Sequence, residues 1–225
     1  MPEKLHRNTD FWDPSLYLDK AAPQFNLALN ILKNYSLKGN ETILDIGCGP
    51  GNITALLAKQ VPQGKVIGID SAQKMVTFAN EKYHDLKNLS FEKRNVLDFS
   101  YPHKFDLIVS FSALHWVINQ KVALANIYKH LAKNGSLLVV MIPSRKVEPV
   151  SAALSKLIET PSWHPYFESF RPPPYYGVSQ EKYQQLLKNT GFEIVFFNEN
   201  KTPVPFDSKE ALANWFESWL AHRQV

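Results

Sequence analysis

The fold of this chain is decided by the stretch Ile43–Gly51, which reads Ile-Leu-Asp-Ile-Gly-Cys-Gly-Pro-Gly. An apolar run that carries Asp45 near its end is typical of a buried strand, and the glycines that follow allow a sharp turn and close approach of a ligand. Residues 52–60 continue with the spacing of a helix. In an open parallel sheet, such a unit places its turn at the carboxyl edge of the strands, where ligands bind.

Strands and helices alternate outward from this stretch. Short apolar runs predict strands at Glu41–Ile46, Lys65–Asp70, Leu89–Arg94, Phe105–Phe111 and Ser136–Ile142. Helical patterns lie between them at Asn52–Gln60, Ala72–Asp85 and Gln120–Leu131, with Asn119 as an N-cap and Asn134-Gly135 as a stop signal for the last. This alternation predicts an α/β fold, a doubly wound, mostly parallel, Rossmann-like sheet with helices on both faces.

The flanks add helices and a small helical cap. Further helices are expected at Gln24–Tyr35, Glu148–Glu159, Ser179–Asn189 and Ser208–His222, with Ser179 as the N-cap and Gly191 as the stop of the third. A strand is expected at Phe192–Asn198, and an aromatic segment of the cap at Trp163–Phe170. The chain then divides into an N-terminal helical lid (1–40), a cofactor-binding α/β core (41–142), a cap insertion (143–178) and the C-terminal part of the core (179–225).

Composition excludes several classes of protein. Of the 225 residues, 44% are hydrophobic and 20% are charged, which is ordinary for a globular domain, and the formal net charge of +4 is scattered rather than gathered in a basic run. We therefore expect no nucleic-acid partner and no membrane partner. Cys48 is the one cysteine, the first residues lead into no apolar run, and a cytoplasmic location is expected.

The ligand of the glycine turn is indicated by charge. The dinucleotide fingerprint G-x-G-x-x-G holds a pyrophosphate on free N–H groups, whereas this turn has the spacing G-x-G-x-G, with a carboxylate at Asp45 and no N–H at Pro50. S-adenosylmethionine has no phosphate and carries an ammonium and a sulfonium, so an acidic strand end followed by open glycine backbone suits it. The alternatives are a purely structural turn and a nicotinamide oxidoreductase, which Asp45 and Pro50 disfavour.

Two further strand ends carry candidate ligand contacts. Asp70 closes the second predicted strand about 20 residues beyond the turn and can accept hydrogen bonds from both hydroxyls of a ribose; alternatively, Asp70 or Ser71 caps the helix that follows. Asn95 and the backbone N–H near Val96 follow the third strand and can supply the acceptor and the donor that an adenine needs, or they form an ordinary turn.

These motifs resemble those of class I S-adenosylmethionine-dependent methyltransferases. The resemblance rests on Asp-x-Gly-Cys-Gly-x-Gly at 45–51, Gly-Ile-Asp-Ser at 68–71 and Phe-Asp-Leu-Ile-Val-Ser at 105–110, and it covers residues 42–142 well. It implies that the turn surrounds the methionine part of the cofactor, that Asp70 holds the ribose and that Asn95 and Val96 meet the adenine. The full set of residues expected at the cofactor is Asp45, Gly47, Cys48, Gly49, Asp70, Ser71, Asn95, Val96 and Ser110.

The family also sets an expectation for the end of the chain. Class I enzymes usually finish with an antiparallel strand, for which the sequence here is poorly suited, because Pro203 and Pro205 interrupt it. We expect that this last strand is cut off; the alternative is that Phe192–Phe206 folds back on itself.

Within the family, the chain is similar to small-molecule carboxyl methyltransferases of the trans-aconitate and juvenile hormone acid types. The N-terminal Trp12–Leu18 resembles the first type, and the segments Ser110–Val117 and Asn126–Tyr128 resemble the second. The resemblance implies that Trp116 and Gln24 hold the carboxylate of the acceptor. The trans-aconitate type has arginine at the Gln24 position, so a less charged acid is favoured here.

The acceptor residues suit an ionised nucleophile. The indole N–H of Trp116 and the amide of Gln24 are neutral donors that can orient a carboxylate, which is already ionised at neutral pH and needs no general base. The bland alternatives are core packing for Trp116 and a solvated helix position for Gln24. If the acceptor were an amine, a hydroxyl or a carbon, His115 would be the first candidate for a base.

The sequence therefore predicts an enzyme that methylates a small molecule, by O-methylation of a carboxylic acid, with S-adenosylmethionine as cofactor and no metal ion. The alternatives are methylation of another acceptor (amine, hydroxyl, carbon or a carrier-bound acid) and a non-catalytic S-adenosylmethionine-binding module. Aromatic residues at both flanks, Tyr17 and Trp163 among them, are expected to form an apolar lid over the acceptor, with ordinary burial as the alternative.

Overall fold

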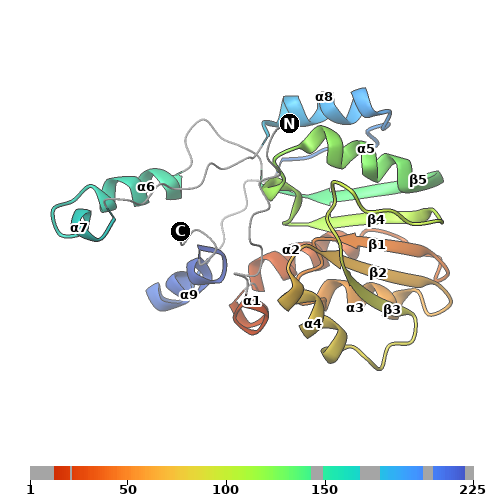
Figure 1. The fold of residues 1–225 in the computed structure, drawn as a ribbon, viewed down its shortest axis with the longest axis horizontal. Helices are drawn as coiled ribbons and strands as arrows, with labels where there is room; N and C mark the ends of the chain where they lie inside the picture. Colours follow the sequence, from red (N-terminus) through yellow and green to blue (C-terminus); the bar gives the residue numbers. More distant parts are fainter. Residues whose placement is uncertain (1–12, 21, 143–148, 168–177, 200–204, 221–225) are drawn as a thin grey trace.

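The architecture is a parallel sheet covered by helices on both faces (Figure 1). The structure, a computed structural model, describes residues 13–20, 22–142, 149–167, 178–199 and 205–220. The strands lie in the order β3-β2-β1-β4-β5, and each neighbouring pair is parallel. Their bounds are Thr42–Ile46 for β1, Lys65–Asp70 for β2, Leu89–Lys93 for β3, Phe105–Phe111 for β4 and Leu131–Val140 for β5. The predicted doubly wound α/β fold is confirmed.

Strand β1 is central because its side chains are buried on both faces. Ile43 and Leu44 are fully buried, and the two residues belong to different apolar clusters on opposite faces of the sheet. The register pairs Asp45 with Gly68 of β2 and with Val109 of β4. The glycine turn after β1 therefore emerges between the ends of β2 and β4, at the carboxyl edge.

Helices α2 (Ala22–Leu32), α3 (Asn52–Gln60) and α4 (Gln73–Lys82) cover one face. Ala28 of α2 and Leu57 of α3 pack with Ile43 in one cluster, and Phe91 of β3 joins α4 in a neighbouring cluster. Helices α5 (Gln120–His130) and α8 (Gln180–Thr190) cover the other face, where Leu124 of α5 packs against α8. This arrangement leaves the carboxyl edge of the strands for the loops.

The remaining elements lie off this layered core. Helices α1 (Pro14–Lys20) and α9 (Lys209–Leu220) lie side by side beyond one end of the sheet, and α6 (Pro149–Ile158) and α7 (His164–Phe167) extend further away (Figure 1). A short 3₁₀ helix, η1 (Leu114–Trp116), follows β4. None of the helices in the described parts of the chain is long and apolar enough to cross a membrane.

Most predicted bounds hold to within a few residues, and both predicted helix caps are confirmed. The Asn119 side chain accepts a hydrogen bond from the backbone N–H of Val122, and Ser179 accepts one from that of Lys182. The predicted stop at Asn134-Gly135 is wrong: α5 ends at His130, and Asn134 lies within β5 with a left-handed φ of 65°. The end of the helix predicted at Ser208–His222 lies outside the described residues.

The strand predicted at Phe192–Asn198 is wrong. Within the described residues 192–199 no strand forms, and the side chains of Val195 and Phe196 are 91% and 81% exposed. The chain leaves α8 through Gly191 in a left-handed conformation, and Phe192 and Phe197 pack on the cluster around Leu124. An alternating apolar pattern makes a strand only where a neighbouring strand offers hydrogen bonds, and here side-chain packing holds the segment instead. The second half of the expected fold-back includes residues 200–204, which lie outside the described residues.

The junction between β1 and α3 is fixed by a buried hydrogen bond. The hydroxyl of Thr54 in α3 donates to the Asp45 carboxylate over 2.7 Å, and the Asp45 side chain is only 2% exposed. Burial raises the pKa of Asp45, the Thr54 hydrogen bond lowers it, and the nearby Asp70 carboxylate raises it; the net result is a pKa of about 7. The ionised form of Asp45 is therefore disfavoured in the folded protein.

This shift predicts a pH-dependent difference between wild type and Asp45→Asn. The folded-state pKa of Asp45, about 7, lies above its unfolded value of about 3.9, so its contribution to stability is full below the lower value and is lost as pH rises through the higher one. The amide that replaces the carboxyl group does not titrate, so the free energy of unfolding of wild type should fall relative to the variant between about pH 4 and pH 8. Urea denaturation across this range measures the difference, and a constant difference would contradict the shift.

Candidate functional site

The turn after β1 takes a conformation that requires glycine. Gly47, Gly49 and Gly51 have φ of 72°, 53° and 84°, a region that other residues rarely adopt. A Cβ on Gly47 would lie 2.2 Å from the Cβ of Ala113, in the loop after β4, so no side chain fits there. At Gly49, by contrast, an added Cβ would meet no atom of the described residues within 4 Å. The turn is thus closed against the protein at Gly47 and open at Gly49, where a ligand can approach the backbone.

The N–H groups of this turn are already bonded within the protein. Those of Gly47 and Cys48 donate to the backbone carbonyl of Ile69, at 2.8 and 3.1 Å. The N–H of Gly49 donates to the Asp70 carboxylate, that of Gly51 donates to the carbonyl of Cys48, and Pro50 has none. A pyrophosphate needs such groups as donors, so this turn fits a ligand without phosphate.

The Asp70 carboxylate ties the end of β2 to the turn. Its two oxygens accept hydrogen bonds from the backbone N–H groups of Gly49 and Ala72, each at 2.9 Å. Burial raises its pKa, and hydrogen bonds from the backbone of Ala72, Gly49 and Ser71 lower it. The bond from Ala72 lies directly ahead of α4, as the helix-start interpretation of Asp70 expects, and the bond from Gly49 places the same carboxylate beside the glycine turn. The ribose role of Asp70 stays a prediction.

Tyr17 in α1 lies near the candidate cofactor residues, although the sequence did not predict it as one of them. Burial, together with the nearby Asp70 carboxylate, raises the pKa of its phenol to about 12. Tyr17 therefore lies close enough to the end of β2 for its pKa to respond to the charge of Asp70. The only signal in the sequence was its membership of the predicted aromatic lid; two other members, Phe11 and Trp12, lie outside the described residues, and Trp163 and Tyr166 are exposed.

Asn95 stands in a turn after β3. Its side-chain oxygen accepts a hydrogen bond from the backbone N–H of Leu97, as the turn interpretation predicts. The Val96 side chain is buried, and within the described parts of the chain its backbone N–H has no hydrogen-bond partner. This N–H remains the candidate donor for an adenine ring.

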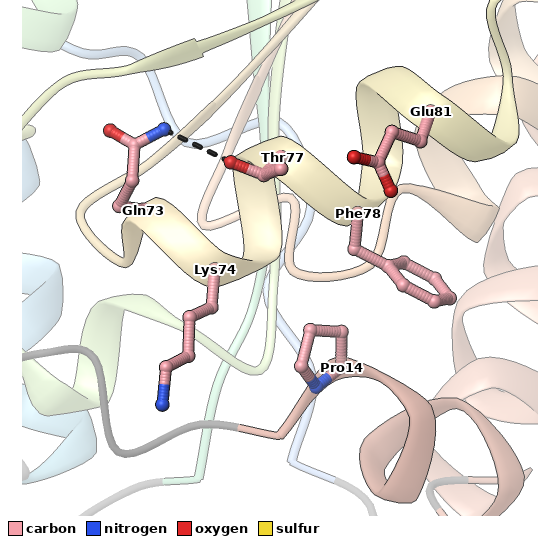
Figure 2. A pocket seen from close by; sticks show the side chains of 6 residues that line it. All are labelled: Pro14, Gln73, Lys74, Thr77, Phe78 and Glu81. Atoms are coloured by element: carbon pink, nitrogen blue, oxygen red, sulfur yellow. Dashed lines mark hydrogen bonds between the residues drawn. The ribbon is translucent and has the colours of Figure 1, made fainter.

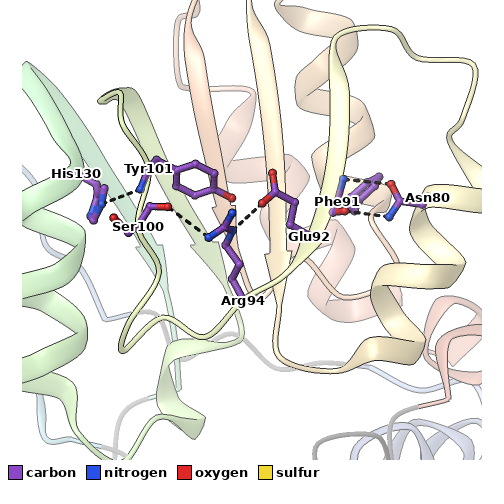
Figure 3. A network of polar contacts seen from close by, with 7 residues as sticks. All are labelled: Asn80, Phe91, Glu92, Arg94, Ser100, Tyr101 and His130. Carbon is purple, nitrogen blue, oxygen red and sulfur yellow. Dashed lines mark hydrogen bonds and ion pairs between the residues drawn. The ribbon is translucent and has the colours of Figure 1, made fainter.

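The loop that carries Asn95 and Val96 is fastened at several points. Asn126 of α5 donates from its amide to the carbonyls of Val96 and Phe99, each at 3.1 Å. Figure 3 shows the outer side of the loop, where Arg94 contacts Glu92 at 2.6 Å and lies against the ring of Tyr101. These contacts hold the loop beside the carboxyl edge.

Two predicted cofactor residues point into the protein. The hydroxyl of Ser110 is fully buried and donates to the carbonyl of Ile46 over 2.8 Å, which ties β4 to β1. The Cys48 side chain is 6% exposed and packs against Val76, Ala79 and Phe91. Burial raises the pKa of the Cys48 thiol well above its ordinary value, so the thiol is not a nucleophile. Both side chains are thus buried in the core next to the turn, where they support it.

His115 and Trp116 lie in η1, directly after β4. Their rings are 5.1 Å apart between centroids, and His115 is 2% exposed. The side-chain amide of Gln120 donates to the carbonyl of Val117 over 2.8 Å and to that of Leu114, which fixes η1 to the start of α5. The His115 Nδ1 accepts a hydrogen bond from the backbone N–H of Ile142 over 3.4 Å.

Gln24 lies in the first turns of α2. Its side-chain oxygen accepts a hydrogen bond from the indole Nε1 of Trp215 in α9, at 3.1 Å. It is partly buried and therefore not simply a solvated helix residue. Among the described residues, no group of three or more His, Cys, Asp and Glu side chains could hold a metal ion.

A separate hollow of about 390 Å³ lies between α1 and α4 (Figure 2). It is lined by Pro14, Gln73, Lys74, Thr77, Phe78 and Glu81. None of these is a predicted site residue. The hollow lies between α1 and the outer side of α4.

Comparison with known proteins agrees with this geometry. The methyltransferase domain family matches residues 37–191. A trans-aconitate 2-methyltransferase of Escherichia coli O45:K1 (strain S88) is 30% identical over 183 residues, which cover 81% of this chain and 69% of that protein.

Solved structures agree as well. A SAM-dependent methyltransferase from Aquifex aeolicus has a TM-score of 0.58 at 25% identity and covers 80% of this chain and 88% of its own. Haemonchus contortus phosphoethanolamine N-methyltransferase 2, solved in complex with S-adenosyl-L-methionine, shares the fold with a TM-score of 0.58 at 22% identity, over 75% of this chain and 37% of that one. The chain belongs to the methyltransferase domain family and is a class I S-adenosylmethionine-dependent methyltransferase.

Proposed function

We propose that the protein transfers the methyl group of S-adenosylmethionine to the carboxylate of a small acid of low charge. The observation that carries this proposal is the state of His115. Its Nδ1 accepts a hydrogen bond from the backbone N–H of Ile142 over 3.4 Å, so in the neutral ring the proton lies on Nε2 and the one basic lone pair is engaged by this bond. An acceptor that must lose a proton is therefore poorly served, whereas a carboxylate needs no base.

The acceptor side is proposed to consist of neutral donors. The indole of Trp116 only donates, and Gln24 offers its amide nitrogen because its oxygen accepts from Trp215. Donors of this kind suit an anionic oxygen without forming an ion pair that would weaken it as a nucleophile. The Escherichia coli relative is named for an acid, trans-aconitate. A neutral amide at position 24, where that type has arginine, favours an acid with fewer charges.

On the cofactor side, we assign the ribose to Asp70, the adenine to Asn95 and Val96, and the methionine part to the open side of the turn at Gly49. Tyr17 closes this site from the lid. Asp45, Cys48 and Ser110 support the turn from within the core, and Gly47 and Ser71 shape its ends. We also propose that the chain divides into an N-terminal helical lid (1–40), a cofactor-binding core (41–142), a cap insertion (143–178) and the C-terminal part of the core (179–225).

The proposed mechanism is one of orientation. When bound, S-adenosylmethionine supplies an electrophilic methyl group on a sulfonium leaving group. The protein's residues then need only to hold the carboxylate in line and exclude water; Trp116 and Gln24 do the first, and the lid helix with Tyr17 does the second. Orientation of this kind can supply about 7–11 kcal/mol.

A methyl-transfer screen tests this function directly. The protein is incubated with S-adenosylmethionine and separate panels of apolar monocarboxylic acids, polycarboxylic acids, amines and alcohols, and products are read by mass spectrometry and by cleavage of esters in alkali. We expect methyl esters of monocarboxylic acids to form fastest. Transfer only to amines or alcohols would contradict the proposal, and cofactor binding without transfer to any panel would favour a non-catalytic module.

Asp70→Asn should weaken S-adenosylmethionine binding. Hydrogen bonds to a charged group contribute about 1.5–3 kcal/mol, so we expect a loss of about 10- to 100-fold in affinity by calorimetry. Asp106→Asn is the matched control, because Asp106 also accepts a backbone N–H, that of Thr42, but near the opposite edge of the sheet. Equal affinities in both variants would remove the ribose assignment.

Trp116→Phe should impair turnover while cofactor binding survives. The variant keeps an aromatic ring and loses the N–H donor, and we expect kcat/KM for the acid to fall by about 10- to 100-fold. Calorimetry with S-adenosylmethionine on the same preparation checks that the cofactor site is intact. Wild-type turnover in this variant would show that the indole N–H is dispensable and that packing explains the residue.

A further inference from the structure

A hydrogen bond joins α2, near the start of the chain, to α9, near its end, at one of the proposed acceptor residues, Gln24. Trp215 in α9 donates its indole N–H to the side-chain oxygen of Gln24 in α2 over 3.1 Å, across 191 residues of sequence. Both side chains are partly buried. Helix α9, which carries Trp215, lies beside α1 off the end of the sheet (Figure 1).

The chemistry of the indole fixes the orientation of the Gln24 amide. An indole N–H can donate but cannot accept, so the amide oxygen must face Trp215, and the NH₂ group must point away from it. If the amide were turned over, its NH₂ group would face the indole N–H, and neither group could accept a hydrogen bond. In the described parts of the chain, the amide nitrogen of Gln24 has no acceptor of its own. Gln24 therefore presents two donors and no acceptor to whatever lies on its other side.

The position of Gln24 places these donors near the carboxyl edge. Ala28 and Leu32, on the same face of α2, are buried against the sheet, and Gln24 lies one turn ahead of Ala28. After α2 the chain reaches the amino end of β1 at Thr42. The C-terminal end of α2 thus points to the amino edge, and its first turns, with Gln24, lie toward the edge that carries η1.

Trp215 is itself supported. Its ring lies 5.4 Å from that of Phe206, with an interplanar angle of 46°. Helix α9 also contacts α1, the helix that carries Tyr17. The indole is therefore held by neighbours on the same side of the molecule as the lid.

We propose that Trp215 is a positioning residue for the methyl acceptor: it holds the Gln24 amide so that both N–H donors face the acceptor carboxylate. The proposal rests on the proposed function. Without the indole, the amide can turn over and offer its oxygen, which repels a carboxylate and instead favours a donor. Trp215 then contributes specificity for an acid over its neutral carboxamide without contacting either.

Trp215→Phe tests this proposal, because it retains a ring against Phe206 and removes the N–H. For the best acid from the screen, we expect KM to rise about 3- to 10-fold with kcat little changed, because Gln24 binds ground state and transition state alike. The corresponding carboxamide is measured as a competitive inhibitor, and its affinity relative to the acid should rise. A purely structural role of Trp215 would weaken both ligands equally and leave this ratio unchanged.

The double variant shows whether Trp215 acts through Gln24. In a Gln24→Ala background, Trp215→Phe should cause no further change in KM or in the acid-to-carboxamide ratio. Phe206→Leu is the packing control, because it removes the neighbouring ring and leaves the indole N–H in place. Gln185→Ala, which removes an exposed amide contact to Asn189 in α8, is the matched control for Gln24→Ala.

The outcomes are distinct. If wild type forms no ester from any acid, the proposed function fails and this inference fails with it. If wild type esterifies acids but Trp215→Phe keeps the wild-type ratio, or has its full effect without Gln24, the inference alone is overturned. Should Trp215→Phe not fold, as judged by circular dichroism, Trp215→Met is measured in its place with the same expectations.

Discussion

The structure depends on how the turn between β1 and α3 is bonded to the end of β2. The Ile69 carbonyl and the Asp70 carboxylate take the N–H groups of Gly47, Cys48 and Gly49, so the turn is held by its neighbour strand rather than by a ligand. Because those donors are occupied, the N–H of Gly51 bonds to the carbonyl of Cys48 and Pro50 has no N–H, the turn presents a surface with no free N–H group from residues 47–51. A sulfonium and an ammonium are compatible with such a surface, whereas a diphosphate is not.

The Asp45 carboxylate does not lie where the sequence predicts. The sequence predicts that its carboxylate faces the ligand, whereas in the structure that carboxylate is buried under the turn and bonded to Thr54, with a pKa raised to about 7. Asp70, which lies nearby, raises the pKa of Asp45, since two buried negative charges repel each other. Asp70 then contributes more negative potential to the cofactor side than Asp45 does. Asp45 contributes most when a bound cation stabilises its ionised form.

What could be predicted from the sequence was local. The strand–turn–helix unit, the two helix caps and the parallel sheet follow from spacing, from glycine conformation and from burial, each of which acts over a few residues. The strand expected at Phe192–Asn198 failed because a strand also needs a partner, which no local pattern specifies. The direction of a side chain within an element has the same limit: Ser110 follows the motif and yet points to the carbonyl of Ile46. The effect of Asp70 on the pKa of Tyr17 could not be predicted from the sequence either, because it depends on where α1 packs.

The cofactor half of the proposed site is positioned by local structure, and the acceptor half is positioned by tertiary contacts. This difference affects specificity. The cofactor residues lie between positions 45 and 96 and are positioned by adjacent strands, so they persist wherever the sheet forms. The proposed acceptor residues come from α2 and η1, and the hydrogen bond from Trp215 of α9 to Gln24 is a tertiary contact. A change at such a contact alters what the site accepts without disturbing the glycine turn. A relative that is 30% identical to this chain can therefore share the cofactor chemistry while its acceptor pocket is arranged for a different acid.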